Sequence, residues 1–167
     1  MKLRITTPSI KLINLIGFWL CFAAIGFAIY LQNYHALTPC PLCIAQRIMI
    51  GLLMIIFLLG WLHVYRGLGR IFHALTILLF SLSGGTFAGR QIWLEHLPRG
   101  QAVLCTPDFT LILERMPLSE TLKALFQGTG ECAEVNWFLF GFSLPTWTLG
   151  FFCLTTIFAL WQLFRKK

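Results

Sequence analysis

Four long apolar runs limit what this 167-residue chain can fold into more than any other feature does. An α-helix needs about 20 apolar residues to cross a lipid bilayer. Runs of this kind cover residues 12–31, 44–64, 71–94 and 144–164. The charges inside them are Arg47, at the start of the second run, and Arg90, near the end of the third. The sequence therefore predicts an all-α fold, an integral membrane four-helix bundle that forms one domain over residues 1–167.

The composition agrees with a membrane protein and excludes other classes. Hydrophobic residues make up 57% of the chain and charged residues only 11%, whereas charged residues make up about 25% of average soluble domains. The net charge of +7 does not indicate nucleic-acid binding, because most basic residues lie at the chain ends and in one short turn. The first apolar run is too long for a cleaved signal peptide, and no small-x-small cleavage site follows it.

The basic residues predict how the spans are oriented. Eight of the thirteen lie next to the runs on one side: Lys2, Arg4 and Lys11 before the first run, Arg66 and Arg70 between the second and third, and Arg165, Lys166 and Lys167 after the fourth. Since positive charge collects on the cytoplasmic side of membrane proteins, we expect both termini and the second turn to be cytoplasmic. Residues 32–43 and 95–143 would then form two segments on the outer side.

The longer outer segment contains a helical pattern. Its apolar residues Leu118, Leu122, Leu125 and Phe126 recur at helical spacing between Pro117 and Gly128, which are typical start and stop signals. This predicts a short amphipathic helix, which would lie either on the outer leaflet or against the protein itself.

Four of the six cysteines fall in the two outer segments, where disulfides persist. They are Cys40 and Cys43 in the short segment, and Cys105 and Cys132 in the long one. The remaining two, Cys21 and Cys153, lie in the middle of spans, and we expect them to pack as small apolar residues.

Cys40 and Cys43 form a Cys-x-x-Cys pair at the start of the second span. A helix N-terminus favours negative charge, and a cysteine pair placed there has a lowered thiol pKa and forms a reactive disulfide. Arg47 lies one turn further on the same face, where it would stabilise a Cys43 thiolate or anchor the helix at the interface. A structural disulfide and half of a zinc site are the alternatives, but no second Cys-x-x-Cys supplies the further zinc ligands.

Cys105 and Cys132 flank the predicted amphipathic helix. A disulfide between them would close a long loop and stabilise the fold by roughly 3–4 kcal/mol, so a structural disulfide is the simpler interpretation of this pair alone. Two pairs on one side of a membrane also suit a relay, because thiol–disulfide exchange passes electrons between dithiols.

These motifs together resemble the DsbB family, the inner-membrane protein-dithiol:quinone oxidoreductases of bacteria. The resemblance covers nearly the whole chain and includes four spans. Its motifs are Pro39-Cys40-Pro41-Leu42-Cys43 with Arg47, Cys105 with Asp108-Phe109, Gly130-Glu131-Cys132-Ala133-Glu134 with Trp137, and Pro145-x-Trp147. Pro41, Leu42 and Gln46 surround the first pair here, and relatives can have an acidic residue at the last position, which affects the local redox potential.

The resemblance implies an electron relay in the bacterial inner membrane, with the cysteines facing the periplasm. A reduced DsbA-like oxidase of thioredoxin fold would attack the Cys105–Cys132 disulfide, and the electrons would pass to the Cys40–Cys43 pair. Cys43 would hand them to a quinone from the membrane pool, ubiquinone or menaquinone, with Arg47 beside the ring. The resemblance implies no metal.

Some residues at the membrane boundaries suggest further roles. His96, next to Glu95 after the third span, would hydrogen-bond a quinone carbonyl or relay a proton, or would be an interfacial histidine without chemistry. Arg90 would help to hold the quinone site, a lipid or the loop, although snorkelling to the interface is the simpler interpretation. Gly84 and Gly85 would allow close helix packing.

Two other functions fit parts of the sequence. The vitamin K epoxide reductase family also has two cysteine pairs on one side of a four-helix bundle, but its quinone-proximal Cys-x-x-Cys lies in the last core span. A non-catalytic four-span scaffold or transporter with two structural disulfides is the other alternative. Transporters usually contain acidic residues within the membrane, and the apolar runs here contain none.

Overall fold

The part of the chain that the computed structural model describes contains four long helices and one short hairpin. The structure describes residues 10–34, 40–63, 65, 68–96, 138–139 and 141–164. The elements are α1 (Ile10–Tyr34), α2 (Pro41–Leu62), α3 (Leu68–Glu95), β1 (Phe138–Leu139), β2 (Phe142–Ser143) and α6 (Leu144–Phe164). Each of the four helices is long and apolar enough to cross a membrane. The predicted all-α membrane bundle is therefore confirmed, whereas the amphipathic helix predicted near residues 117–128 lies outside the described residues.

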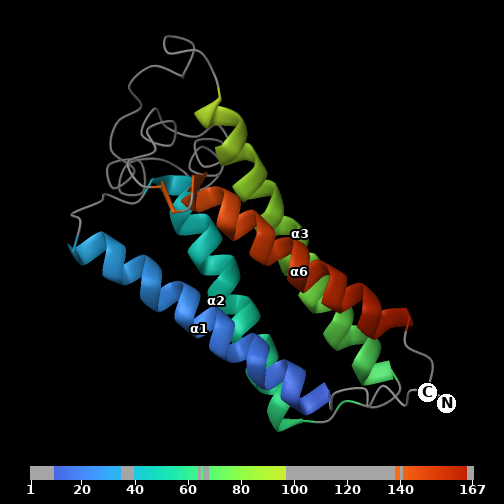
Figure 1. Cartoon of the computed structure of the whole chain (residues 1–167). Helices are drawn as coiled ribbons and strands as arrows, with labels where there is room; N and C mark the ends of the chain where they lie inside the picture. Colours follow the sequence, from blue (N-terminus) through green and yellow to red (C-terminus); the bar gives the residue numbers. More distant parts are fainter. Residues whose placement is uncertain are drawn as a thin grey trace, which may run out of the picture.

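The four helices run alternately up and down (Figure 1). The last turns of α1 and α3 and the first turns of α2 and α6 lie at the same end of the bundle, which we call the cysteine end because Cys40 lies there. The other end is called the far end. Helix α3 packs most extensively on α6, while α2 contacts both α1 and α3. Helix α2 thus lies between the first helix and the α3–α6 pair.

Local sequence determines where α2 begins and ends. Cys40 has extended backbone angles (φ −70°, ψ 161°) and is the N-cap, and Pro41 follows at the first helical position, where its missing N–H costs nothing. The helix therefore starts three residues before the apolar run that predicted it. At its other end the N–H of His63 donates to the Leu59 carbonyl at 2.8 Å.

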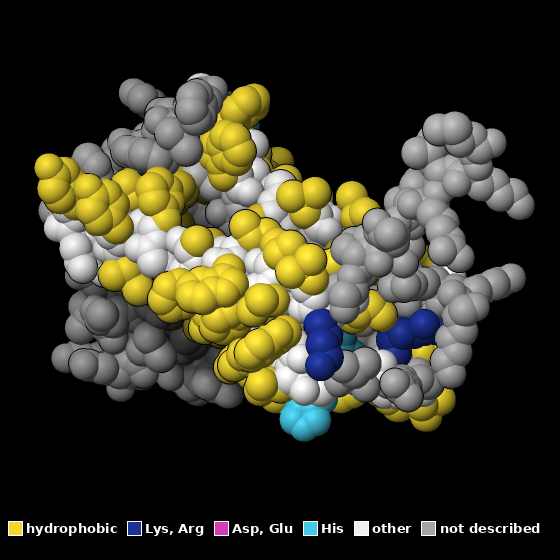
Figure 2. Space-filling view, turned by 60° about the horizontal axis from the view of Figure 1, so that its bottom comes forward, with side chains coloured by type: hydrophobic (Ala, Val, Ile, Leu, Met, Phe, Trp, Pro, Cys, Tyr) yellow, Lys and Arg dark blue, Asp and Glu magenta, His cyan; other side chains and the backbone are white. Residues whose placement is uncertain are grey.

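The helices bury an apolar interior and expose apolar side chains outward. The main core cluster consists of Cys21, Ile50, Leu53, Phe57, Ile77, Ala88, Phe152 and Ala159. Large apolar side chains also cover the described outer surface, as Figure 2 shows in a view with the far end forward. A surface of this kind suits lipid rather than water.

Polar side chains inside the bundle join different helices. Near the far end Gln162 of α6 lies 3.3 Å from His73 of α3, whose other ring nitrogen lies 3.2 Å from the Ile56 carbonyl of α2. A Cβ at Gly60 would collide with His73 and with Asn14 of α1. Gly60 thus leaves room for the side chains of His73 and Asn14. Hydrogen bonds such as the one between Gln162 and His73 hold membrane helices together.

Two features differ from what the sequence predicts. Cys21 is fully buried, as expected, but Cys153 lies on the exposed side of α6. The expectation that Cys153 packs between helices is therefore wrong, because an apolar run does not reveal which of its faces meets lipid. The β1–β2 hairpin was not predicted; its pairs are Phe138 with Ser143 and Leu139 with Phe142, and its Gly141 has a φ of 82°.

Gly84→Ala should destabilise the bundle. A Cβ at Gly84 would overlap the ring of Phe152, which is 1% exposed in the core, and overpacking of this kind costs about 1–3 kcal/mol. Gly89→Ala in the same helix is the matched control, because a Cβ there meets nothing within 4 Å. Unfolding measured in detergent micelles should show a lower free energy of unfolding for Gly84→Ala only. Equal stability of the two variants would contradict the α3–α6 packing.

Candidate functional site: a cysteine pair at the start of helix α2

Cys40 and Cys43 lie together at the N-terminus of α2. Their sulfur atoms are 3.0 Å apart, and Cys40 Sγ also accepts a hydrogen bond from the backbone N–H of Cys43 at 3.4 Å. Cys40 is 4% exposed, while Cys43 is half-buried. The pair therefore sits where the unpaired N–H groups and the dipole of the helix favour negative charge on sulfur.

Two hydrogen-bonded glutamines lie beside Cys43. Gln91 of α3 places its Nε2 3.3 Å and its Oε1 3.6 Å from Cys43 Sγ. Gln46 of α2 donates from its Nε2 to Gln91 Oε1 at 2.8 Å. Both glutamines are buried, at 5% and 4% exposure. Gln91 is not among the site residues predicted from the sequence, although an uncharged polar residue in an apolar span is itself a sign of hydrogen bonding inside the bundle.

Arg47 joins α2 to α1. Its guanidinium donates to the side-chain oxygen of Gln32 at 2.6 Å and to the Ala28 carbonyl at 3.2 Å. Arg47 follows Cys43 by one helical turn, as the spacing predicts, but both of these bonds go to the neighbouring helix. A guanidinium has five N–H donors, so these two bonds leave others for a further acceptor.

The end of α3 lies at the cysteine end of the bundle and contains His96. This histidine is exposed, and its Nδ1 lies 2.8 Å from the Ile92 carbonyl of its own helix. The adjacent Glu95 accepts a hydrogen bond at 2.9 Å from Ser143, which in turn lies 3.0 Å from Thr146 of α6. These contacts fix the last turn of α3 against the start of α6.

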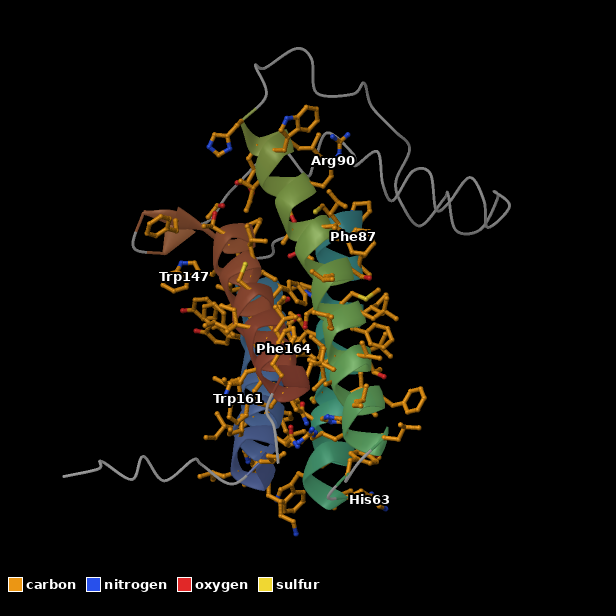
Figure 3. All side chains as sticks on the ribbon, turned by 90° about the vertical axis from the view of Figure 1, so that its right-hand side faces the viewer. His63, Phe87, Arg90, Trp147, Trp161 and Phe164 are labelled. Atoms are coloured by element: carbon orange, nitrogen blue, oxygen red, sulfur yellow. The ribbon has the colours of Figure 1, made fainter. Side chains whose placement is uncertain are left out.

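Arg90 points outward from α3, as Figure 3 shows. Its guanidinium carbon lies 4.3 Å from the ring centre of Trp93, a distance at which a cation is attracted to the face of an indole. The pairing agrees with an interfacial role for Arg90.

The second cysteine pair, Cys105 and Cys132, lies outside the described residues. Within the described residues, the structure brings Cys40, Cys43 and Gln91 into contact. His96 follows Gln91 by five residues in the sequence. Within the described parts of the chain, no group of three or more His, Cys, Asp or Glu side chains is arranged to hold a metal ion.

The described geometry suits thiol–disulfide chemistry. Two sulfur atoms lie within contact distance, one of them half-buried and one nearly buried, and N–H donors from the helix start and from Gln91 point at them. Such donors stabilise the thiolate, which is the reactive form. The fold and the site define a multi-pass membrane protein with two cysteines in contact at the start of a membrane-spanning helix.

Comparison with known proteins agrees with this class. The family model of disulfide bond formation protein DsbB matches residues 10–162. The chain belongs to the DsbB family, and so to the membrane oxidoreductases of disulfide bond formation.

Several relatives share most of their length with this chain. Disulfide bond formation protein B of Methylococcus capsulatus is 40% identical over 157 residues, which cover 94% of this chain and 96% of the relative. The protein of the same name from Hahella chejuensis is 44% identical and covers 85% of this chain and 89% of its own. That of Acinetobacter baumannii is 34% identical, covering 99% and 93%.

Arg47 and Gln32 should stabilise the fold as a pair. Arg47→Met and Gln32→Met should each reduce the free energy of unfolding, and the double variant should lose about 1 kcal/mol less than the sum, because the hydrogen bond can be lost only once. A double-mutant cycle of unfolding in mixed micelles measures this coupling. Gln32→Met combined with Arg90→Met is the control and should be additive. Additive losses for the Arg47 pair would show that the contact contributes nothing.

Proposed function

We propose that this protein reoxidises a periplasmic DsbA-type thiol oxidase and passes the electrons to a membrane quinone. The observation that carries this proposal is the contact between Cys40 and Cys43 at the start of α2. Both termini would be cytoplasmic, which places the cysteine end of the bundle at the periplasmic face of the inner membrane. The basic residues that lie in the sequence before α1, between α2 and α3, and after α6 support this orientation.

The relay would consist of two thiol–disulfide exchanges. A thiolate of the reduced oxidase attacks the Cys105–Cys132 disulfide, forms a mixed disulfide with Cys105 and releases the Cys132 thiolate. The second thiol of the oxidase then displaces Cys105, so the oxidase leaves as a disulfide and Cys105 and Cys132 remain reduced. The same exchange with the Cys40–Cys43 disulfide moves the two electrons to the helix α2 pair.

The residues around Cys43 fit a quinone site. Cys43 is half-buried at the boundary of an apolar span, where a lipid-soluble molecule has access. Arg47 would offer its remaining N–H groups to a carbonyl oxygen, and His96 would offer a ring nitrogen. A bound quinone would accept two electrons and two protons. In this assignment Cys43 is the sulfur nearest the quinone, and Cys40 is its disulfide partner.

Reduction potentials explain why a quinone suits this role. A DsbA-type oxidase has a potential of about −120 mV, and 30 mV corresponds to about 1.4 kcal/mol for two electrons. A glutathione-like acceptor near −200 mV would make reoxidation unfavourable by several kcal/mol. The acceptor therefore provides the driving force, while the protein provides the path and the positioning.

The test is quinone reduction by the purified protein. Reduced DsbA-type oxidase is added to the protein in detergent with ubiquinone or with menaquinone, and the quinone absorbance is followed. We expect catalytic loss of the oxidised quinone signal with at least one of the two. Absence of turnover with both, in protein shown to be folded, would contradict the proposal.

Cys43→Ser should separate the two halves of the relay. Quinone reduction should be lost, because the sulfur nearest the quinone is missing, while Cys105 should still trap the oxidase as a mixed disulfide. Turnover measures quinone reduction, and a non-reducing gel shows the mixed disulfide between Cys105 and the oxidase. Cys153→Ser is the control, because Cys153 is exposed on α6 and outside the relay, and its turnover should stay near that of the parent. Turnover that survives Cys43→Ser would show that another sulfur faces the quinone.

A further inference from the structure

We propose that Gln91 is a catalytic residue whose amide N–H stabilises the Cys43 thiolate, and that Gln46 is the positioning residue that orients this amide. The inference deepens the proposed function, since it assigns the groups that set the reactivity of the sulfur nearest the quinone. It depends on Cys43 reacting as a thiolate.

The amide of Gln91 contacts the sulfur through both of its polar atoms. Nε2 lies 3.3 Å and Oε1 3.6 Å from Cys43 Sγ. When Cys43 is a thiol, its S–H can donate to Oε1; when the proton has left for water, the thiolate can accept from Nε2. The shorter contact belongs to the N–H donor, so the arrangement favours the charged form.

Gln46 determines which end of the amide faces the sulfur. It donates from Nε2 to Gln91 Oε1 at 2.8 Å, which holds that oxygen and leaves the Gln91 N–H for Cys43. If the Gln91 amide rotated by half a turn, its NH₂ would meet the NH₂ of Gln46, and its carbonyl oxygen would face the sulfur. A carbonyl oxygen repels a thiolate, so the orientation has a chemical consequence.

Burial strengthens this effect. Gln91 and Gln46 are 5% and 4% exposed, and Cys43 packs against an apolar cluster made of Cys40, Leu42, Ala45, Phe87 and Leu94. Hydrogen bonds to charged groups are stronger where water is excluded, and an unpaired charge there is more costly.

The charged and titratable groups at this end have other described contacts. Arg47 of α2 bonds to Gln32 and Ala28 of α1, where Tyr30 stacks on Tyr34 with ring centres 5.4 Å apart. On α3, Arg90 lies over Trp93 and Glu95 accepts a hydrogen bond from Ser143. His96, which follows α3, lies against the Ile92 carbonyl. Cys40 shares the pair with Cys43. The Gln91 amide is the polar group of α3 that the described hydrogen bonds place against the Cys43 sulfur.

The test is the pH profile of Cys43 alkylation in the reduced full-length protein. A Cys40→Ser background leaves one thiol of the pair and keeps an N-cap residue. Iodoacetamide labelling of the Cys43 peptide is followed by mass spectrometry. Gln91→Met should move the pH of half-maximal rate upward by about one unit and slow labelling at neutral pH about tenfold, as expected for loss of one hydrogen bond to a charged group.

Variants of Gln46 test the orienting role. In its ionised form the carboxylate of Gln46→Glu has only acceptors, so the Gln91 amide should turn its NH₂ to the carboxylate and its oxygen to the sulfur. This should move the profile upward at least as far as Gln91→Met does, and Gln46→Met should move it by less. An unchanged profile for both Gln46 variants would overturn the orienting role.

Gln162→Met is the matched control, because it removes another buried glutamine, 2% exposed, at the far end of α6. It should leave the profile unchanged. A Gln91→Met profile that coincides with that of the Cys40→Ser parent, or an equal shift in Gln162→Met, would overturn the proposal. If Gln91→Met does not fold, the two Gln46 profiles decide.

A second readout keeps both cysteines. In the Cys40–Cys43 protein, equilibration with a dithiol buffer should show that Gln91→Met makes the pair less oxidising, because the reduced form loses its stabilising contact. A purely structural role would not change this potential. Neither readout needs quinone or the thiol oxidase, so a failure here is distinct from a failure of quinone reduction.

Discussion

The arrangement of this protein depends on one constraint: a polar group inside an apolar bundle must find its partner within the protein. Lipid offers no hydrogen bonds, and several buried polar side chains here pair across helices. Ser81 bonds to Thr155 at 2.8 Å, and Gln91 meets Gln46 and Cys43 at the cysteine end. These contacts tie α3 to α6 and to α2, and the same pairing that aligns the helices places an amide against the sulfur of Cys43.

The start of α2 concentrates the chemistry for a related reason. A helix N-terminus has unpaired N–H groups, and here the N-cap is itself a cysteine whose sulfur accepts the N–H of Cys43. Pro41 follows at a position where no N–H is needed. The residues that end the extended chain and begin the helix are therefore also the residues of the proposed redox pair, and they lie at the boundary of the apolar span.

Several parts of the fold and the site follow from sequence alone, and others do not. The four spans follow from the length and composition of their runs, and the spacing of Cys40 and Cys43 brings their sulfur atoms onto one helix start. The partners of Arg47 on α1 could not be predicted, because a spacing of one turn shows only which residues share a face of the same helix. The exposure of Cys153 could not be predicted, because the sequence does not show which face of α6 meets lipid. The β1–β2 hairpin was missed because each of its strands has only two residues.

The sequence by itself determined the class of fold, the cysteine pair and the family, because these depend on local composition, spacing and motif. Only the tertiary structure decided which groups surround Cys43. Gln91 is 48 residues away in the chain, and its contact with the sulfur depends on how far α3 is shifted and rotated relative to α2. That register is set by packing and by pairing of buried polar groups across the bundle, which no single helix contains.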